Sequence, residues 1–353
     1  MTERPGATPE GELAVGVVGC GYWGPNLVRN LSENERTRVA VVADLRPERL
    51  ETIARRAPGA RLTTRPEELI EDPAVEAVAI ATPVSTHYAL ARRALEAGKH
   101  VLVAKPLAAS VEEADHLVAL AEQTGGVLMV DHTYVYTGAV RKISSLLEER
   151  ALGDLYYLDS VRVNLGLFQH DVNVIWDLAA HDFSIFTELL GVEPVSVQAV
   201  GSSHSASGLE DVAYVTLEYE SSLLAHCHVN WLSPVKIRQT LIGGSERMLV
   251  WNDLAADEKV KVYDSGFDAI PGDEQGLHQT IVSYRTGDVW MPRIERHEAL
   301  ALELDHFVDC VRGGACPTTG GEAGRRVVRL LEATSASLRA GGRAVELAEP
   351  VGG

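Results

Sequence analysis

The sequence predicts an α/β chain in two parts: a doubly wound parallel sheet at the N-terminus, and a C-terminal α+β domain with a large open, mostly antiparallel sheet. Up to about residue 133, short apolar runs alternate with helical patterns, as in a parallel sheet covered on both faces. Later apolar runs are longer and often alternate in polarity, as in half-exposed strands. We expect a disordered tail over 1–12, a first domain over 13–133 and a second over 134–353.

The elements of the first domain follow from this alternation. Strands are predicted at 14–18, 39–43, 77–81, 100–103 and 127–130, and helices at 25–31, 47–56, 86–97 and 111–123. Ser110 with Glu113 three residues later is a capping box, which marks the start of the last of these helices. Gly98 and Gly125 follow their helices, where glycine favours a left-handed C-cap.

The second domain contains most of the predicted strands. They lie at 155–165, 195–203, 212–219, 223–231, 237–242, 248–251, 259–263 and 344–347, with helices at 176–190, 297–312 and 322–339. The segment 264–293 is polar and Gly-rich, which suits either a long loop near the site or an interface arm. Helices on one face of such a sheet leave the other uncovered, so we expect a homodimer or homotetramer formed through this sheet.

The turn Gly19-Cys20-Gly21-Tyr22-Trp23-Gly24 joins the first predicted strand to the first predicted helix. In such a turn the first glycine permits a tight bend and the second lets a pyrophosphate approach the backbone. The third glycine permits close packing of helix on strand, and the helix N-terminus faces the phosphates. The turn therefore predicts a dinucleotide-binding Rossmann domain, in which Tyr22 and Trp23 belong to the binding loop.

Asp44 ends the second predicted strand, about 20 residues after the turn, where a carboxylate accepts hydrogen bonds from an adenosine ribose. The same carboxylate repels a 2′-phosphate, so we expect NAD in preference to NADP. A tight turn without a ligand is the alternative interpretation, and the flanking strands and the acid argue against it.

Composition excludes several classes of partner. The formal charge of −18 argues against nucleic acid or an anionic membrane as the main partner. The four cysteines show no CxxC pair, so we expect reduced thiols in a cytoplasmic protein. No apolar run approaches the roughly 18 residues of a membrane span.

Lys105-Pro106 follows the strand predicted at 100–103, at the edge of a parallel sheet where ligands bind. A lysine beside a cationic nicotinamide has its charged form disfavoured, so it can exchange protons with a substrate hydroxyl. An exposed lysine at a strand end is the alternative. Pro106 also makes a cis peptide bond accessible.

Asp177 and His181 stand four residues apart on a predicted helix, so their side chains project from one face. A carboxylate that orients an imidazole is a common acid–base pair. The alternative is a helix-start acid beside a hydrogen-bonded, partly buried histidine.

Other polar side chains give weaker indications. His226 and His228 share one face of a strand, but they have no further ligands at metal-binding spacing, so we expect no metal. Arg162 and Asn164, on another strand, are candidate substrate contacts, and a solvated sheet face is the alternative.

Four motifs occur together in one order: Gly19–Gly24, Ala81–His87, Lys105-Pro106 and Asp177 with His181. In combination they resemble the glucose–fructose oxidoreductase, inositol dehydrogenase and MocA (Gfo/Idh/MocA) family of NAD(P)-dependent sugar and polyol oxidoreductases. The resemblance spans nearly the whole chain. It implies Lys105, Asp177 and His181 as catalytic residues.

The same resemblance extends to the cofactor and the substrate. It implies that Thr82, Pro83 and His87 belong to the cofactor site, with Thr82 and Pro83 near the nicotinamide half. The runs Gly21–Asn30 and Trp176–Asp182 look most like those of nucleotide-sugar 3-dehydrogenases. One position departs from the family pattern: Ala104 precedes Lys105 where the family usually has glutamate, which puts cofactor placement in question.

These observations predict an oxidoreductase that transfers hydride between NAD and a sugar hydroxyl or ketone, at C3 of a nucleotide-activated hexose such as a UDP- or TDP-sugar. In this hypothesis His181 takes the hydroxyl proton and Lys105 stabilises the oxyanion, although the two roles are interchangeable. A free-sugar or inositol dehydrogenase is the first alternative. The second is a dinucleotide-binding protein without turnover, for which Ala104 is the one supporting feature.

Overall fold

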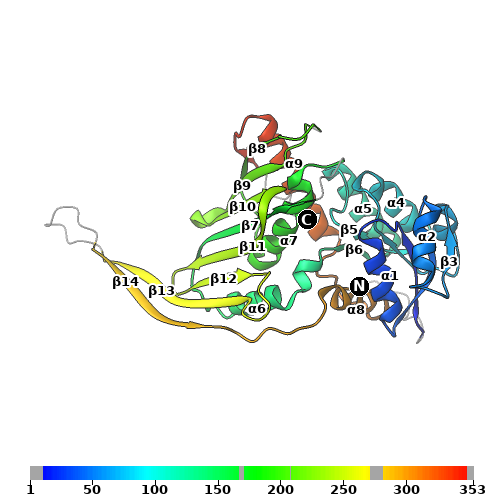
Figure 1. The fold of residues 1–353 in the computed structure, drawn as a ribbon, viewed down its shortest axis with the longest axis horizontal. Helices are drawn as coiled ribbons and strands as arrows, with labels where there is room; N and C mark the ends of the chain where they lie inside the picture. Colours follow the sequence, from blue (N-terminus) through cyan, green and yellow to red (C-terminus); the bar gives the residue numbers. More distant parts are fainter. Residues whose placement is uncertain (1–10, 167–170, 207, 271–280, 348–353) are drawn as a thin grey trace. The chain divides into compact units, whose positions relative to one another are not determined.

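Two compact units make up the computed structural model, which describes residues 11–166, 171–206, 208–270 and 281–347 (Figure 1). The first unit comprises Met1–Thr137 with His297–Glu332, and the second comprises Gly138–Arg296 with Ala333–Gly353. Residues 1–10 of the expected N-terminal tail lie outside the described residues.

Six parallel strands form the sheet of the first unit, in the order β3-β2-β1-β4-β5-β6. They are β1 (Leu13–Val18), β2 (Thr37–Ala43), β3 (Arg61–Thr63), β4 (Ala77–Ile80), β5 (His100–Ala104) and β6 (Leu128–Asp131). The chain moves outward from β1 to β3 on one side and from β4 to β6 on the other. The direction reverses between β1 and β4, and their carboxyl ends form the point where ligands bind in such sheets. The predicted doubly wound sheet is confirmed.

Helices cover both faces of this sheet. They are α1 (Gly24–Glu33), α2 (Pro47–Ala54), α3 (Pro66–Ile70), α4 (His87–Glu96), α5 (Val111–Thr124) and α8 (Ala299–Gly313), with short 3₁₀ turns η1 (Val84–Thr86) and η2 (Thr133–Tyr136). On one face, Val15 and Val17 pack in a buried cluster with side chains of α1 and α8. On the other face, Leu69 of α3 lies so close to Gly16 that an added Cβ would stand 2.5 Å from its side chain.

The helix α8 changes the division that the sequence analysis expected. His297–Glu332 was assigned there to the second domain, whereas these residues belong to the first compact unit. The cause is the apolar stripe of α8, because Leu304 and Phe307 are buried in the same cluster as Leu27 of α1. Periodicity identified this helix but could not say which sheet its apolar side would cover.

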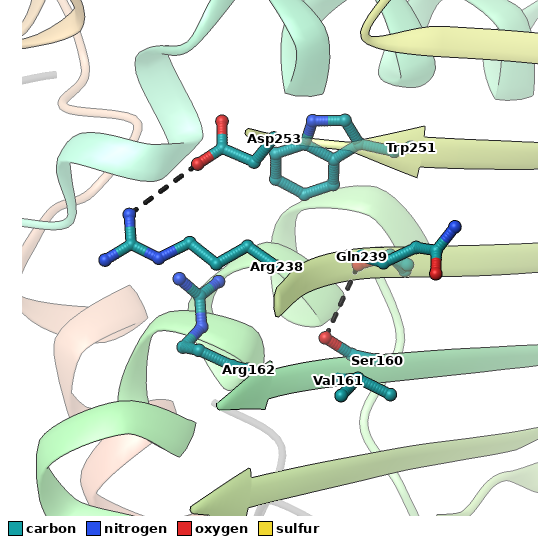
Figure 2. Close-up of a pocket in the computed structure, with 8 residues that line it drawn as sticks. Ser160, Val161, Arg162, Arg238, Gln239, Trp251 and Asp253 are labelled. Carbon is teal, nitrogen blue, oxygen red and sulfur yellow. Dashed lines mark hydrogen bonds and ion pairs between the residues drawn. The ribbon is translucent and has the colours of Figure 1, made fainter. Parts of the chain in front are cut away.

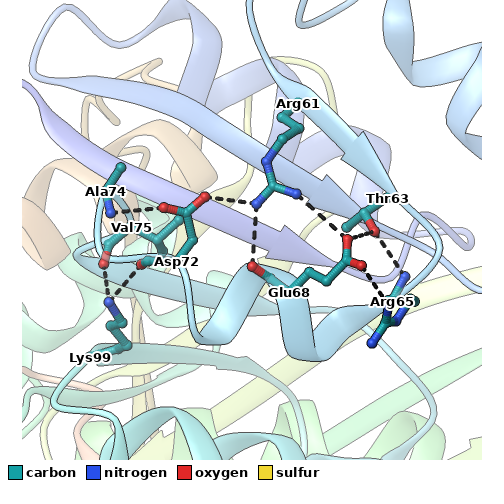
Figure 3. A network of polar contacts seen from close by, with 8 residues as sticks. All are labelled: Arg61, Thr63, Arg65, Glu68, Asp72, Ala74, Val75 and Lys99. Atoms are coloured by element: carbon teal, nitrogen blue, oxygen red, sulfur yellow. Dashed lines mark hydrogen bonds and ion pairs between the residues drawn. The ribbon is translucent and has the colours of Figure 1, made fainter.

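A polar network holds the short outer elements β3 and α3, which the sequence analysis did not predict (Figure 3). The Arg61 guanidinium lies 2.7 Å from the Asp72 carboxylate and 3.7 Å from that of Glu68. Backbone donation from Ala74, and then Arg61, lowers the pKa of Asp72. Lys99 donates to the carbonyl oxygens of residues 72 and 75 at 2.9 and 2.6 Å. These contacts join β3, α3 and the segment before β4.

Nine strands form the sheet of the second unit, in the order β14-β13-β12-β11-β7-β10-β9-β8-β15. They are β7 (Leu155–Leu165), β8 (Ser196–Ser202), β9 (Val212–Glu218), β10 (Leu224–Asn230), β11 (Leu232–Gly244), β12 (Met248–Asn252), β13 (Val260–Ile270), β14 (Ile281–Trp290) and β15 (Val345–Glu346). All neighbouring pairs are antiparallel except β7 and β10, which are parallel. The predicted large, mostly antiparallel sheet is confirmed.

One face of this sheet is buried and the other is open. Along β10, Ala225, Cys227 and Val229 are buried, while His226 and His228 on the opposite face are partly exposed. The helical elements of the unit are α6 (Gly138–Glu148), the π-helical turn η3 (Ile175–Ala179), α7 (Ala180–Leu190), the 3₁₀ turn η4 (Glu220–Ser222) and the last part of α9 (Gly321–Arg339).

Two segments of the second unit differ from the sequence expectation. The helix α6 was not predicted. The described parts of 264–293 are mainly the antiparallel strands β13 and β14, so this segment is not simply a loop. Its polar and Gly-rich composition hid the strand pattern. Residues 271–280 lie outside the described residues.

Across the described ranges, no helix combines the length and the apolar composition that crossing a bilayer requires.

The cap of α5 provides a test of the local fold. Ser110 Oγ accepts a hydrogen bond from the Glu113 amide at 3.2 Å, as the capping box predicts. We expect Ser110→Ala to destabilise the protein by about 1 kcal/mol, because the first turn of α5 loses this acceptor. The urea midpoint of the transition that unfolds α5 measures the change. Ser32→Ala, on the exposed side of α1, is the control, and an equal loss there would remove the cap as the explanation.

Candidate active site

The glycine turn has the geometry of a dinucleotide-binding loop. Gly19 has φ +95°, and a Cβ there would lie 2.5 Å from the carbonyl oxygen of Ala81. A Cβ on Gly24 would lie 1.9 Å from the carbonyl oxygen of Gly19. A Cβ on Gly21 would meet only the tip of Arg49, at 3.7 Å. The first and third glycines are therefore required by packing, whereas space at the second is left for an approaching ligand.

The Asp44 side chain is hydrogen-bonded to the same turn. Its Oδ2 accepts a hydrogen bond from the backbone amide of Cys20 at 2.6 Å, and its Oδ1 accepts one from the amide of Arg46 at 2.9 Å. Arg49 Nη1 lies 3.4 Å from Oδ2. These contacts fix the carboxylate at the end of β2, next to the turn. The residues fit the adenosine half of a dinucleotide, with the glycine turn for the pyrophosphate and Asp44 for the ribose.

The carboxyl ends of β4 and β5 bring Thr82, His87 and Lys105 into one region of the first unit. The buried His87 ring places Nε2 2.8 Å from the carbonyl oxygen of Thr82 and Nδ1 2.8 Å from that of Pro106. Both ring nitrogens face backbone, so we expect His87 to position the two loops instead of contacting cofactor. The exposed hydroxyl of Thr86 donates to the Thr82 hydroxyl at 2.7 Å. The Lys105–Pro106 peptide bond is cis, as the sequence analysis allowed.

A buried histidine lies within the electrostatic reach of Lys105. His132 follows β6 and is 1 % exposed. Burial, and then the positive charge of Lys105, lowers the pKa of His132 to about 3. This histidine is therefore neutral at physiological pH, and it adds no positive charge beside the lysine.

Asp177 and His181 lie in the second unit, on consecutive helical elements. Asp177 is in the π-helical turn η3, and His181 is the second residue of α7. The Trp231 indole, which is buried, donates a hydrogen bond from Nε1 to Asp177 Oδ2 at 3.0 Å. Single π-helical turns within helices are often found at functional sites. Trp231 was not singled out in the sequence, because its partner is 54 residues away.

Arg162 is held in a buried ion pair with Asp182. Its Nε and Nη2 lie 3.0 Å from the two carboxylate oxygens, and Ser160 Oγ donates to Asp182 at 2.8 Å. The Arg162 and Asp182 side chains are 5 % and 1 % exposed. The ion pair supports α7 against the sheet, and a direct contact of Arg162 with the substrate stays a prediction. Asn164 lies two residues further along β7 and is partly exposed.

A small pocket adjoins this ion pair on β7, β11 and β12 (Figure 2). Arg162 and Arg238 lie on the same side of it. Arg238 forms an ion pair with Asp253, with Nη1 3.7 Å from Oδ2. Thr240 Oγ1 lies 3.4 Å from Ser160 Oγ. Both arginines are thus paired with carboxylates of the protein, Arg162 with Asp182 and Arg238 with Asp253.

The paired histidines of β10 stack on an aromatic ring. Tyr214 lies 4.4 Å from His228 and 6.3 Å from His226, measured between ring centroids. Within the described residues, no group of three or more His, Cys, Asp or Glu side chains is placed to hold a metal ion.

Comparison with protein-family models covers both units. Residues 13–132 match the model described as "Oxidoreductase family, NAD-binding Rossmann fold". Residues 140–250 match the GFO/IDH/MocA C-terminal domain. The chain belongs to the Gfo/Idh/MocA family. It is accordingly an NAD(P)-dependent oxidoreductase of the type that acts on CH–OH groups.

Individual Gfo/Idh/MocA relatives differ in substrate. UDP-N-acetylglucosamine 3-dehydrogenase of Acidithiobacillus ferrooxidans is 29% identical, over 72% of this chain and 76% of that protein. The NAD-dependent scyllo-inositol 2-dehydrogenase of Bacillus subtilis is 26% identical, over 87% of this chain and 89% of that protein. The crystal structure of GenD2 from gentamicin A biosynthesis, in complex with NAD, has a TM-score of 0.81 and is 26% identical, covering 97% of this chain and 99% of that one.

Proposed function

We propose that this protein is an NAD-dependent dehydrogenase or ketoreductase that acts at C3 of a nucleotide-activated hexose, such as a UDP- or TDP-sugar. The observation that carries the proposal is the similarity to UDP-N-acetylglucosamine 3-dehydrogenase, together with the presence of Lys105, Asp177 and His181 in this chain. An inositol or free-sugar dehydrogenase is the second candidate, favoured by the similarity to scyllo-inositol 2-dehydrogenase. GenD2, a structural relative, comes from gentamicin A biosynthesis, and we propose that this enzyme serves polysaccharide or secondary-metabolite sugar biosynthesis.

The proposed chemistry assigns each group one task. Bound NAD would supply a nicotinamide ring that accepts hydride from the sugar carbon. His181 takes the proton of the reacting hydroxyl, and Asp177 keeps the imidazole oriented for that transfer. Trp231 fixes Asp177 through its indole N–H. The Lys105 ammonium stabilises the oxyanion that develops on the same oxygen. For the reverse reaction the two groups protonate a 3-keto sugar. Exchange of the two roles is the alternative assignment.

Three further proposals concern the cofactor preference, the oligomeric state and the cellular location of the protein. NAD is preferred to NADP, because the Asp44 carboxylate repels a 2′-phosphate. The open face of the nine-stranded sheet pairs with a second copy, giving a homodimer or homotetramer, because Tyr214, Leu224 and Ile237 are exposed there. We also propose a cytoplasmic location, since all four cysteines are free.

The test is NADH formation from NAD⁺ with a panel of UDP- and TDP-hexoses, free sugars and inositols, followed by NADH fluorescence. We expect turnover with a nucleotide sugar and inhibition of that turnover by the free nucleotide. Turnover confined to inositols or free sugars, without inhibition by UDP or TDP, would transfer the assignment to the second candidate. NADH binding without turnover, in both directions and with every sugar, would contradict both candidates.

A further inference from the structure

A row of small side chains crosses the ligand-binding edge of the first unit and ends in a carboxylate. Strand register aligns Val18 with Ile80, Ile80 with Val103, and Ala104 with Asp131. The next position along each strand, or directly after it, therefore forms the row Gly19, Ala81, Ala104 and Asp131, which lies on one face of the sheet. The first three positions carry at most a methyl group. Asp131, at the end of β6, is 3 % exposed.

The Trp23 side chain reaches along this row. Its indole Nε1 donates a hydrogen bond to Asp131 Oδ2, which joins the glycine turn after β1 to the end of β6. Strands β4 and β5 separate those two strands, a span of roughly 14 Å at the usual strand spacing. Trp23 and Ala81 both pack against the buried cluster on this face. The small side chains of Ala81 and Ala104 are consistent with an indole that crosses this face.

A second buried acid faces Asp131 from α8. Glu303 is 0 % exposed, and its neighbours include Asp131 of β6 and Thr133 of η2. Burial, and then the charge of Asp131, raises the pKa of Glu303 well above its usual range. Thr133 Oγ1 donates to Asp131 Oδ1. Asp131 therefore has donors on both of its oxygens, and the raised pKa of Glu303 favours its protonated form.

The other titratable groups at this site are Tyr136, His132 and Lys105. The Tyr136 hydroxyl lies 3.2 Å from Thr319 Oγ1, and burial followed by the charge of Glu303 raises its pKa. His132 is neutral, and within the described residues neither of its ring nitrogens has a hydrogen-bond partner. Among these side chains, Lys105 carries the positive charge closest to His132.

We propose that Asp131 is a positioning residue for the dinucleotide: it holds Trp23, and through Trp23 the glycine turn, as long as Glu303 remains uncharged. The proposal rests on the cofactor site described above and not on the identity of the sugar. If Glu303 loses its proton, two buried carboxylates repel each other, and Asp131 is displaced from the indole. The turn that binds the pyrophosphate then loses its attachment to β6.

The first test is the dissociation constant of NADH without any sugar, measured by fluorescence from neutral to alkaline pH, as far as the protein remains folded. We expect the wild-type protein to lose roughly tenfold in affinity over this range, which corresponds to about 1.4 kcal/mol. Glu303→Gln is the matched variant, because glutamine has the shape of the protonated acid. It should bind NADH like the wild type at neutral pH and keep that affinity at alkaline pH. A flat wild-type profile, or an equal alkaline loss in Glu303→Gln, would overturn the proposal.

The second test separates positioning from general damage to the fold. Trp23→Phe removes the donor and Asp131→Leu removes the acceptor of one hydrogen bond. Each should weaken NADH binding by roughly tenfold, and the double variant should be no weaker than either. Additive losses would contradict a positioning role for the hydrogen bond between Trp23 and Asp131. The Glu303 comparison remains informative if Asp131→Leu does not fold. NADH binding requires no sugar, so a wrong substrate class leaves these results unaffected.

Discussion

Replacing Lys105 or His181 by alanine is expected to lower turnover by roughly 10²–10⁴-fold, the usual contribution of a positioned acid or base. His181→Ala removes the group proposed to accept the hydroxyl proton. Lys105→Ala removes the cation proposed to stabilise the oxyanion. The effect should appear in kcat, measured with saturating NAD⁺ and the sugar that the panel identifies, while His181→Ala keeps the NADH affinity of the wild type.

Matched controls exist for both substitutions. His204 forms a second Asp–His pair, with Nδ1 2.8 Å from Asp211 Oδ1, and its side chain is 58% exposed. His204→Ala therefore removes a comparable pair that the proposed chemistry does not use. Lys236→Met removes an exposed lysine from β11. Both controls should retain turnover, and near-normal activity in His181→Ala and Lys105→Ala together would refute the proposed mechanism.

The parallel half of the fold could be predicted because its signals are local. Each β-strand of the first unit apart from β3 contains a short apolar run, and the Gly19–Gly24 turn and the Ser110 cap mark where helices begin. The strand β3 has three residues and depends on the Arg61 ion pairs, which a periodicity search does not detect. The apolar stripe of α8 could have packed against either sheet. The sequence pattern alone therefore did not show that α8 packs on the sheet of the first unit.

The candidate site could be predicted only in part, for a similar reason. The motif residues Asp44 and Lys105 follow strands, so their place at the ligand-binding edge follows from strand direction. Their supporting residues come from distant segments: Trp231 holds Asp177, and Asp131 holds Trp23. Ala104 was recognisable in the sequence as a departure from the family pattern. Its neighbour Asp131, one strand away, became apparent only from the register of β5 and β6.

Arg162→Ala is expected to destabilise the second unit by roughly 3–5 kcal/mol, the usual cost of removing one partner from a buried ion pair. The Asp182 carboxylate would remain almost fully buried, with the hydroxyl of Ser160 on β7 still donating to it. Asp182→Ala should lower the free energy of unfolding by a similar amount, because it leaves the buried Arg162 guanidinium without its carboxylate partner. Thermal and urea unfolding measure both changes, with Arg150→Ala, a surface ion pair to Asp154, as the control.

The double variant Arg162→Met with Asp182→Leu distinguishes the two interpretations of Arg162. Apolar side chains of similar volume often replace a buried pair without loss, so this variant should be more stable than either single substitution to alanine. If Arg162 only supports α7, the double variant should also keep the KM for the sugar. A variant that folds well but has a KM raised by roughly tenfold or more, about 1.4 kcal/mol of binding, would support Arg162 as a substrate contact. The stability and KM measurements together therefore decide whether the charge on β7 serves the fold or the ligand.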